Sequence, residues 1–304
     1  MYGIIGSGFG IYGYLPAIVL ELDRSVLLLE KSRSTVESRP ELVEYLKKVV
    51  WTNTVDELIN RSTGIILAVP PESQAKIVRE IIAKKNLREI VLEKPLSPTP
   101  RESRIILDRF YETNKPFRIG YTFLHTDWFE QSVLNAKSKN AKLLFITWKF
   151  KAHHFRTSCD TWKRYHSKGG GVISFYSIHL FATLAVLGYT NVDSAIVVEG
   201  AIDQPNALYT TYSGKDLPKC QVLVDTNSDR TIFETSLMLE NGEIAYSYRQ
   251  AGPFICSGAE GDIRINVLRK ILSSFSQHDN LIVSRSQNYQ VIRLWEQVTD
   301  HYRR

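Results

Sequence analysis

Residues 2–13, YGIIGSGFGIYG, carry the pattern that decides the fold. A short apolar run, Tyr2 to Ile5, leads into a cluster of glycines, and a stretch of helical periodicity follows from Tyr12 to Leu22. A dinucleotide-binding turn needs glycines here, because the chain turns tightly and its backbone approaches a pyrophosphate closely. The following helix then offers N–H groups and a partial positive charge to the anion. The stretch therefore predicts the first strand–turn–helix unit of a nucleotide-binding sheet.

Two registers of the glycine motif are possible. In the first, Gly6 and Gly8 make the turn at the end of the strand, and Gly10 eases the start of the helix, but the third glycine is missing. In the second, Gly8, Gly10 and Gly13 match the full spacing but begin later. The first register is favoured for the phosphate turn, because it places the turn directly after the strand. The residues expected to contact the cofactor here are Gly6, Gly8, Phe9 and Gly10.

An acidic residue closes the second apolar run, which extends from Ser25 to Glu30. Glu30 follows Gly6 by 24 residues, about the distance at which a carboxylate binds the ribose hydroxyls of a dinucleotide. A carboxylate repels a 2′-phosphate and so favours NAD, whereas Lys31 and Arg33 are placed to receive that phosphate. The expected cofactor is therefore NAD or NADP, with a slight preference for NAD.

The first 122 residues alternate strand-like and helical segments, which predicts βαβ units and a doubly wound parallel sheet, a Rossmann domain over residues 1–122. The last helix of this domain is expected to place Ile105, Ile106 and Phe110 on one face. The predicted strands are 2–5, 25–30, 64–69, 89–92 and 117–121, and the predicted helices are 12–22, 41–49, 54–59, 77–82 and 101–113.

After about residue 123 the pattern changes to alternation. Leu144, Ile146, Trp148 and Phe150 share one face of the segment 143–152, as in a half-buried strand. We expect a second α+β domain, residues 123–304, with a mostly antiparallel open sheet and helices on one face. Further strands are predicted at 192–199, 208–212, 221–224, 231–239 and 243–248, with a hairpin turn at Asn241-Gly242 and helices near 262–275 and 287–302.

Composition excludes several classes of protein. The 304 residues carry a net charge of +6 and are 43% hydrophobic, which fits about two folded domains and excludes a mainly disordered chain. The 3 cysteines are too few and too scattered for a disulfide framework, and the N-terminus shows no secretory pattern. The stretch 171–189 contains serine, histidine and threonine, so a buried helix is favoured over a membrane span. We expect a cytoplasmic protein with no membrane partner.

Four segments together carry a resemblance to a known family: Gly6-x-Gly8, Ala68–Pro71, Glu93–Pro95, and Gly169–Gly171 eight residues before His179. In this combination the chain resembles the Gfo/Idh/MocA family of glucose–fructose oxidoreductase and inositol dehydrogenase, over nearly its whole length. The resemblance implies a Rossmann domain followed by a substrate-binding domain whose open sheet often forms a dimer face, hence a homo-oligomer, either a dimer or a tetramer. It also implies an NAD(P)-dependent dehydrogenase or reductase acting on a carbinol or carbonyl of a sugar, cyclitol or nucleotide sugar.

The resemblance also implies roles for individual residues. Lys94 resembles the lysine that holds the reacting oxygen, where a cation stabilises developing alkoxide charge. Pro95 resembles a proline that is commonly cis, and His179 resembles the catalytic histidine that exchanges the proton. The resemblance further assigns Val69, Pro70, Glu93 and Lys94 to the cofactor, and Lys94, Tyr121 and His179 to the substrate.

The sequence departs from the family four residues before His179, where Phe175 replaces the usual aspartate. The run Thr122–His125 likewise stands where many members carry an asparagine and an arginine. Four outcomes are open: His179 acts alone, Tyr176 or another hydroxyl transfers the proton, hydride transfer proceeds with little acid assistance, or catalysis is lost. The last outcome defines an alternative function, a catalytically silent nucleotide-binding member that serves as a regulator or an assembly subunit.

Residues 137–168 carry 9 Lys+Arg against the single Asp160, with aromatic residues between them. Arg156 and Lys163 are candidates for holding an anionic substrate, such as a nucleotide-diphosphate sugar or a sugar acid, with Trp162 stacking on a sugar or base. The alternative is a solvated sheet face guarded by lysines. No nucleic-acid recognition motif is present, and the histidines and cysteines lack standard ligand spacing, so neither nucleic acid nor a metal is expected.

Overall fold

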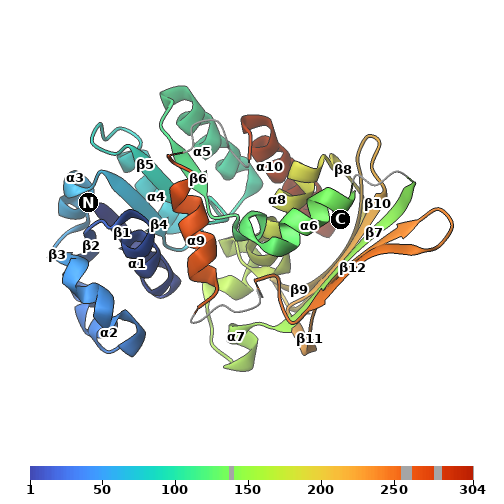
Figure 1. The fold of residues 1–304 in the computed structure, drawn as a ribbon, viewed down its shortest axis with the longest axis horizontal. Coiled ribbons are helices and arrows are strands. Elements are labelled where there is room, and N and C mark those ends of the chain that lie inside the picture. Colours follow the sequence, from blue (N-terminus) through green and yellow to red (C-terminus); the bar gives the residue numbers. More distant parts are fainter. Residues whose placement is uncertain (137–139, 255–261, 277–282, 304) are drawn as a thin grey trace. The chain divides into compact units, whose positions relative to one another are not determined.

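The computed structural model describes residues 1–136, 140–254, 262–276 and 283–303 (Figure 1). The chain divides into two compact units. The first unit comprises Met1–Ser97, Ile105–Thr122 and Gly258–Leu281, and the second comprises Pro98–Arg104, Phe123–Ser257 and Ile282–Arg304. This division differs from a single boundary at residue 122 in two places. A short segment, Pro98–Arg104, belongs to the second unit, and a late segment, Gly258–Leu281, belongs to the first.

The first unit is built on a parallel sheet with the strand order β3-β2-β1-β4-β5-β6. The order reverses between β1 and β4, which is the topological switch point at which such sheets bind ligands. Gly6 pairs with Ala68, and Leu67 pairs with Leu92, so the carboxyl ends of three strands lie side by side. The predicted doubly wound class is confirmed. The strands are β1 (Tyr2–Gly6), β2 (Val26–Leu29), β3 (Val49–Thr52), β4 (Gly64–Ala68), β5 (Glu89–Leu92) and β6 (Phe117–Ile119).

The core of the first unit lies between the sheet and two helices that are distant in sequence. Buried side chains of α1, including Leu15 and Ile18, pack with Leu268 and Ile271 of α9 in a single hydrophobic cluster. The helices of this unit are α1 (Phe9–Leu22), α2 (Arg33–Glu37), α3 (Val55–Arg61), α4 (Pro71–Ile81), α9 (Arg264–Ser273) and most of α5 (Pro100–Thr113), with 3₁₀ segments at Glu30–Ser32 and Pro40–Lys48.

Three sequence-based expectations in this unit are wrong in detail. The segment predicted as a helix over 41–49 is a 3₁₀ segment, Pro40–Lys48, followed by the unpredicted strand β3. That strand has only four residues and depends on pairing with β2, which a local pattern does not reveal. Ile105 is 47% exposed, because the buried stripe of α5 runs through Ile106 and Phe110 instead.

The second unit is built on a mixed, mostly antiparallel sheet with the strand order β12-β11-β7-β10-β9-β8, in which β7 and β10 pair in parallel. Leu144, Ile146 and Trp148 are buried along β7, as their alternation predicts. Gly242 has φ +86°, in agreement with the predicted hairpin turn between β11 and β12. The strands are β7 (Ala141–Lys151), β8 (Asn191–Ala201), β9 (Gln204–Ser213), β10 (Lys219–Asp225), β11 (Asn227–Leu239) and β12 (Ile244–Gln250).

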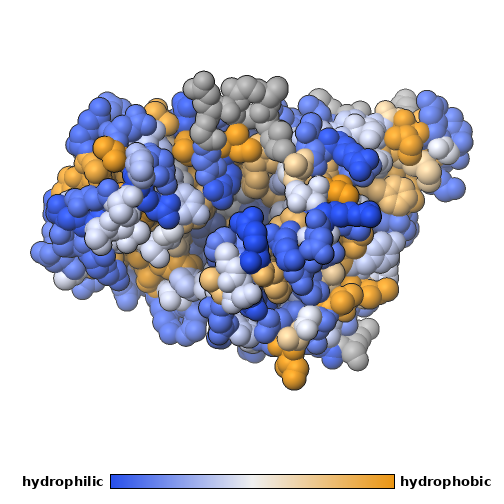
Figure 2. All heavy atoms as spheres, turned by 90° about the horizontal axis from the view of Figure 1, so that it is seen from below, coloured by the Kyte–Doolittle hydropathy of each residue, from blue (hydrophilic) through white to orange (hydrophobic). Residues whose placement is uncertain are grey.

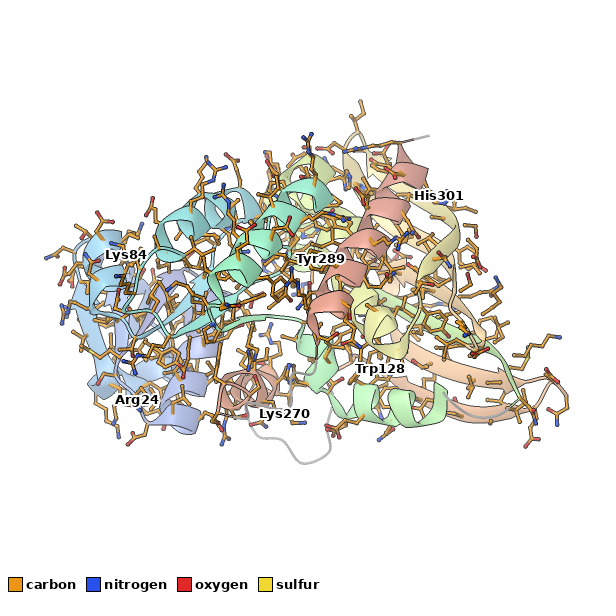
Figure 3. All side chains as sticks on the ribbon, turned by 90° about the horizontal axis from the view of Figure 1, so that it is seen from above. Arg24, Lys84, Trp128, Lys270, Tyr289 and His301 are labelled. Carbon is orange, nitrogen blue, oxygen red and sulfur yellow. The ribbon has the colours of Figure 1, made fainter. Side chains whose placement is uncertain are left out.

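Helices of the second unit cover one side of this sheet (Figure 1). Trp128, at the start of α6 and labelled in Figure 3, donates its indole N–H to Thr235 of β11 at 2.8 Å. Ser284 begins α10 with a capping box completed by Gln287. The helices are α6 (Asp127–Ala136), α7 (His153–Arg156), α8 (Ile178–Leu187) and α10 (Arg285–Tyr302), with one turn of π-helix at Val172–Tyr176 before α8.

The face shown in Figure 2 is mainly hydrophilic, with apolar side chains in small groups. Helix α8 is almost entirely buried, which confirms the buried helix predicted within 171–189. Within the described part of the chain, no single helix has the length and hydropathy needed to cross a membrane, although the bent pair His166–Tyr176 and Ile178–Leu187 passes by length and composition.

Candidate functional site

The glycine turn lies directly at the end of β1, as the first register predicts. Strand β1 ends at Gly6 and α1 begins at Phe9, so the turn occupies only two residues between them. Gly6 has φ +153°, and a Cβ atom there would lie 2.3 Å from the carbonyl oxygen of Ala68. Gly10 would place a Cβ 2.5 Å from the Ala68 Cβ, so both glycines permit close packing of the turn on β4. These two positions therefore require glycine, because any side chain there would collide with Ala68.

Gly13 has a different role from the glycines of the turn. A Cβ atom there would lie 2.9 Å from the side chains of both Phe9 and Leu268. The residue therefore lets α1 pack closely against α9, inside the helix and beyond the turn. The second register would make Gly13 part of the phosphate motif. In the structure Gly13 serves helix packing, so that register joins the turn residue Gly8 to a residue with another role.

Two guanidinium groups lie beside the first turn of α1. Arg264 of α9 lies over the ring of Phe9 at 4.8 Å from its centre, and Arg39 lies over Tyr12 at 4.9 Å. Arg264 also forms a bidentate pair with Asp262, at 2.5 and 2.8 Å. Neither arginine was predicted from the sequence, because neither adjoins the glycine motif. Only the packing of α9 on α1 brings Arg264 beside the first turn of α1. Both guanidinium groups are paired with carboxylates, Arg264 with Asp262 and Arg39 with Glu41, so their charges are partly balanced.

The end of β2 brings together the residues that the sequence predicts to select between NAD and NADP. Arg33 binds both carboxylate oxygens of Glu30, with Nε–Oε1 at 2.7 Å and Nη2–Oε2 at 3.0 Å. The same guanidinium lies over the ring of Trp51 at 4.7 Å. Lys31 is exposed beside them. The carboxylate that would bind a ribose is therefore already paired with the cation that would bind a 2′-phosphate.

Lys94 follows the end of β5 and is 9% exposed. The Lys94–Pro95 peptide bond is cis, as the family resemblance implies. The preceding Glu93 carboxylate accepts a hydrogen bond of 2.8 Å from the fully buried Tyr14 of α1. Burial raises the pKa of the Tyr14 phenol, and the neighbouring Glu93 carboxylate raises it further, so Tyr14 is a donor at neutral pH.

Two other residues assigned to the cofactor lie near this edge of the sheet. Val69 and Pro70 directly follow β4, between the carboxyl ends of β1 and β5, and they are partly and largely exposed. Tyr121, assigned to the substrate, is 3% exposed, and burial raises the pKa of its phenol. A phenol with a raised pKa is a poor acid, so Tyr121 is poorly suited to donating a proton at neutral pH.

His179 is the second residue of α8 in the second unit and is 6% exposed. Its ring stacks on Phe123, with ring centres 4.6 Å apart and an interplanar angle of 11°. Phe123 is itself fully buried and makes edge contacts with Trp128 and Trp148. An aromatic stack therefore holds one face of the imidazole ring. Phe123 was noted in the sequence only as part of a departure from the family pattern.

Phe175 lies in the π-helical turn before α8, and its ring contacts a cation and other aromatic rings. The ammonium of Lys163 lies 5.2 Å from the centre of its ring, and Trp162 meets it edge-on at 5.2 Å. An aromatic face attracts an ammonium group through its quadrupole. The phenylalanine therefore retains an attraction for a cation at the position where the family has an acid, although it accepts no proton.

Tyr176 packs among Phe150, His154 and Phe175, with ring centres 4.8 to 6.2 Å away. Burial raises the pKa of the Tyr176 phenol, which makes it a weaker proton donor and disfavours its use in place of His179. Burial, together with Arg164 and Lys163, lowers the pKa of His154 to about 4, so this histidine is neutral at pH 7.

The cations of the basic stretch 137–168 lie in different surroundings. Residues 137–139 lie outside the described residues. Trp162 and Lys163 are half-buried against Phe175, and Gly170 permits this, since a Cβ there would lie 2.3 Å from the Trp162 carbonyl oxygen. Arg156 is exposed at the end of α7, and Lys151 pairs with an aspartate of β11. The structure brings Trp162 and Lys163 together, and Arg156 makes no ion pair among the described residues.

The strand order of the first unit, with a glycine turn at its switch point, defines a dinucleotide-binding Rossmann domain. Residues 1–121 match the Gfo/Idh/MocA model, described as an oxidoreductase family with an NAD-binding Rossmann fold. This match over residues 1–121 confirms, for the Rossmann domain, the resemblance found in the sequence. No curated protein matches the chain in sequence.

Solved structures extend the likeness of fold to the whole chain. GenD2 from gentamicin A biosynthesis, in complex with NAD, is 13% identical, with a TM-score of 0.75, covering 99% of this chain and 93% of that one. Levoglucosan dehydrogenase with NADH and levoglucosan is 14% identical, with a TM-score of 0.72, covering 99% and 96%. UDP-N-acetylglucosamine 3-dehydrogenase GnnA from Acidithiobacillus ferrooxidans is 12% identical, with a TM-score of 0.70, covering 99% and 96%. At these identities the likeness concerns the fold alone.

Proposed function

We propose that the protein transfers a hydride between the nicotinamide of NAD(P) and a carbinol or carbonyl carbon of a sugar or nucleotide sugar. Lys94 polarises the reacting oxygen in this proposal, and His179 exchanges the proton. The observation that carries the proposal is the position of Lys94. It follows β5, two strands from the glycine turn, at the edge of the sheet where doubly wound folds bind dinucleotides.

The residues of the first unit fit a bound dinucleotide. The Gly6–Gly8 backbone and the N-terminus of α1 would hold the pyrophosphate, and Glu30 or Arg33 would meet the adenosine ribose. The bound cofactor supplies the hydride or accepts it. Lys94 then stabilises negative charge that develops on the substrate oxygen, and such preorganised charges account for a large part of many rate enhancements.

His179 fits the role of proton exchanger by its chemistry, because an imidazole titrates near neutral pH. The raised pKa values of Tyr176 and Tyr121 make these two phenols weaker alternatives. Stacking on Phe123 fixes the plane of the imidazole ring and so constrains the directions of its nitrogen atoms. We therefore propose that His179 acts alone, which is one of the outcomes left open by the replacement at Phe175.

The substrate class rests on two arguments. Two structures of similar fold are named as dehydrogenases of a sugar derivative and of a nucleotide sugar. In this chain, Trp162 offers an aromatic surface, and Lys163 and Arg156 offer cations, a combination that suits a sugar carrying a phosphate or carboxylate. The distinction between a neutral and an anionic sugar is then tested by comparing matched substrates with and without a phosphate.

The first test is cofactor binding. We expect the purified protein, checked for retained nucleotide, to quench or enhance the fluorescence of NADH or NADPH on titration. Turnover is then measured with a panel of sugars and nucleotide sugars. Binding of neither cofactor would remove the oxidoreductase proposal. Cofactor binding without turnover on the whole panel would support the alternative of a catalytically silent member.

The second test removes the two catalytic groups. We expect Lys94→Ala and His179→Ala each to lower kcat by about a hundredfold, the size typical of losing a general acid or a charge that stabilises the transition state. Lys47→Ala and His301→Ala, at positions away from the proposed chemistry, serve as controls. Steady-state kinetics provide the measurement, and unchanged turnover in both Lys94→Ala and His179→Ala would contradict the assignment.

A further inference from the structure

Gln74 is a polar side chain that is completely buried in the first turn of α4. It lies four and seven residues before Val78 and Ile81, which form the buried stripe of the same helix. A buried amide needs hydrogen-bond partners, because it loses its hydration on folding. The position of Gln74 on an apolar stripe is therefore a sequence signal for a specific polar contact.

The amide of Gln74 forms four hydrogen bonds, all to one loop. The two N–H groups of Nε2 are shared among the carbonyl oxygens of Glu93 at 2.7 Å, Pro95 at 3.2 Å and Leu96 at 3.2 Å. Oε1 accepts from the backbone N–H of Glu93 at 3.1 Å. The network itself fixes the orientation of the amide, since carbonyls need the NH₂ group and the N–H needs the oxygen.

The residues that Gln74 contacts lie on both sides of Lys94 along the chain. Glu93 precedes it, and Pro95 and Leu96 follow it, so one side chain ties the backbone on both sides of the lysine to α4. The Glu93 side chain is held separately by the phenol of Tyr14. The loop from which the ammonium extends is therefore held by side chains of two helices, Tyr14 of α1 and Gln74 of α4.

We propose that Gln74 is a positioning residue for Lys94. The inference rests on the proposed function, in which Lys94 stabilises charge on the substrate oxygen. The interaction between two charges depends on their separation, and a misplacement of about 1 Å lowers turnover strongly. Gln74 contacts only backbone in this network, so it acts through the place of Lys94 and not on the substrate.

Gln74→Met tests this role, because methionine keeps a similar volume and removes all four hydrogen bonds. We expect kcat to fall by about tenfold or more, as for a displaced catalytic group, while KM and the affinity for NADH stay within about twofold. Lys76→Met is the matched control, since it places the same residue at an exposed position of the same helix. Thermal melting of both variants shows whether the fold is kept.

A double-mutant cycle separates positioning from a general structural role. If Gln74 acts through Lys94, then Gln74→Met lowers the remaining activity of Lys94→Ala by less than about twofold. The effects of two substitutions on kcat are not additive when one residue acts only through the other. An equal loss in both backgrounds, in an active wild type, would overturn the inference and leave the proposed function intact.

Gln74→Glu supplies a pH signature. At neutral pH the introduced carboxylate faces three carbonyl oxygens without a proton to donate. Burial raises the pKa of such a carboxyl group, and protonation returns one donor. We expect kcat of the variant relative to the wild type to rise as the pH falls, and a constant ratio would count against positioning by hydrogen bonds.

Hydrogen exchange keeps the inference separate from the proposed function. We expect the backbone amides of the Glu93–Leu96 loop to exchange faster in Gln74→Met than in Lys76→Met, with the rest of the first unit unchanged. Equal protection of this loop in the two variants would overturn the anchoring. A wild type that binds cofactor without turnover would instead overturn the proposed function, whatever the exchange shows.

Discussion

At the residue scale, Phe175 shows how one substitution changes the setting of a candidate catalytic group. The sequence indicates that His179 loses its usual carboxylate partner, and the structure shows what surrounds both residues instead. Lys163 lies over the Phe175 ring, and the His179 ring stacks on Phe123. Neither contact was predictable from spacing, since both partners come from other segments of the second unit. Gln74 differs in this respect, because its place on an apolar stripe marks it in the sequence.

We propose that Glu30 and Arg33 select between NAD and NADP. Removing Arg33 leaves the Glu30 carboxylate unpaired and takes away a cation that would meet a 2′-phosphate. We therefore expect Arg33→Ala to raise the dissociation constant of NADPH relative to that of NADH by about fivefold, the size expected of an exposed charge pair. We expect Glu30→Gln to lower the dissociation constant of NADPH relative to that of NADH.

Fluorescence titration with each cofactor measures these ratios. Glu44→Gln, an exposed acid outside the glycine turn, is the control for a general change of charge. A shift of both variants in the same direction would show that the pair does not select the cofactor.

At the element scale, the local patterns predict the type of most strands and helices but not their partners. The short strand β3 was missed, because its four residues become a strand only by pairing with β2. Helix α9 was predicted near its correct place but assigned to the second domain, whereas it packs with α1 and belongs to the first unit. A helical pattern specifies an apolar face and does not say which sheet covers it.

The packing of α9 on α1 gives a prediction about stability. Leu268 is fully buried and lies where Gly13 leaves room for it. We expect Leu268→Ala to lower the free energy of unfolding by about 3 kcal/mol, the range for a buried leucine truncated to alanine. The loss should weaken NADH binding as well, since the cavity lies behind the helix of the glycine turn.

Denaturant unfolding with an NADH titration measures both effects. Lys270→Ala, an exposed change on the same helix labelled in Figure 3, is the matched control. If Leu268→Ala unfolds at the same denaturant concentration as Lys270→Ala, the contact between α1 and α9 is not an important part of the core.

At the scale of the whole molecule, the chain forms two units that are not two continuous segments. The alternating and helical patterns predict a Rossmann domain followed by an α+β domain, and both architectures are present. The exchange of segments around residues 98–104 and 258–281 has no local signal, because it depends on which core each segment joins. Unfolding of such units is cooperative, so one buried titrating group affects a whole unit.

His154 gives a pH dependence of this kind. Its pKa is about 4 in the folded chain and near 6.5 when unfolded, so the unfolded state binds the extra proton first. The contribution of neutral His154 to stability is therefore complete above pH 6.5 and is lost as the pH falls toward 4, up to about 3 kcal/mol. We expect His154→Phe to flatten the pH dependence of unfolding in this window.

Denaturant unfolding at several pH values between 4.5 and 7.5 provides the measurement. His301→Phe replaces a histidine of α10 that is not among the groups that lower the His154 pKa, and it is the control for loss of a histidine elsewhere in the second unit. A slope in His154→Phe equal to that of the wild type would show that another group is responsible.

The sequence by itself determined the class of the fold, the glycine turn and the identity of the candidate groups Lys94 and His179. The fold class and the turn follow from local causes, the periodicity of apolar residues and the steric needs of glycine, whereas Lys94 and His179 follow from the resemblance to the family. Only the tertiary structure decided what surrounds those groups, because burial and contact depend on residues far apart in the chain. The pairing of Tyr14 with Glu93, the anchoring by Gln74, and the arrival of Arg264 from α9 are of this second kind.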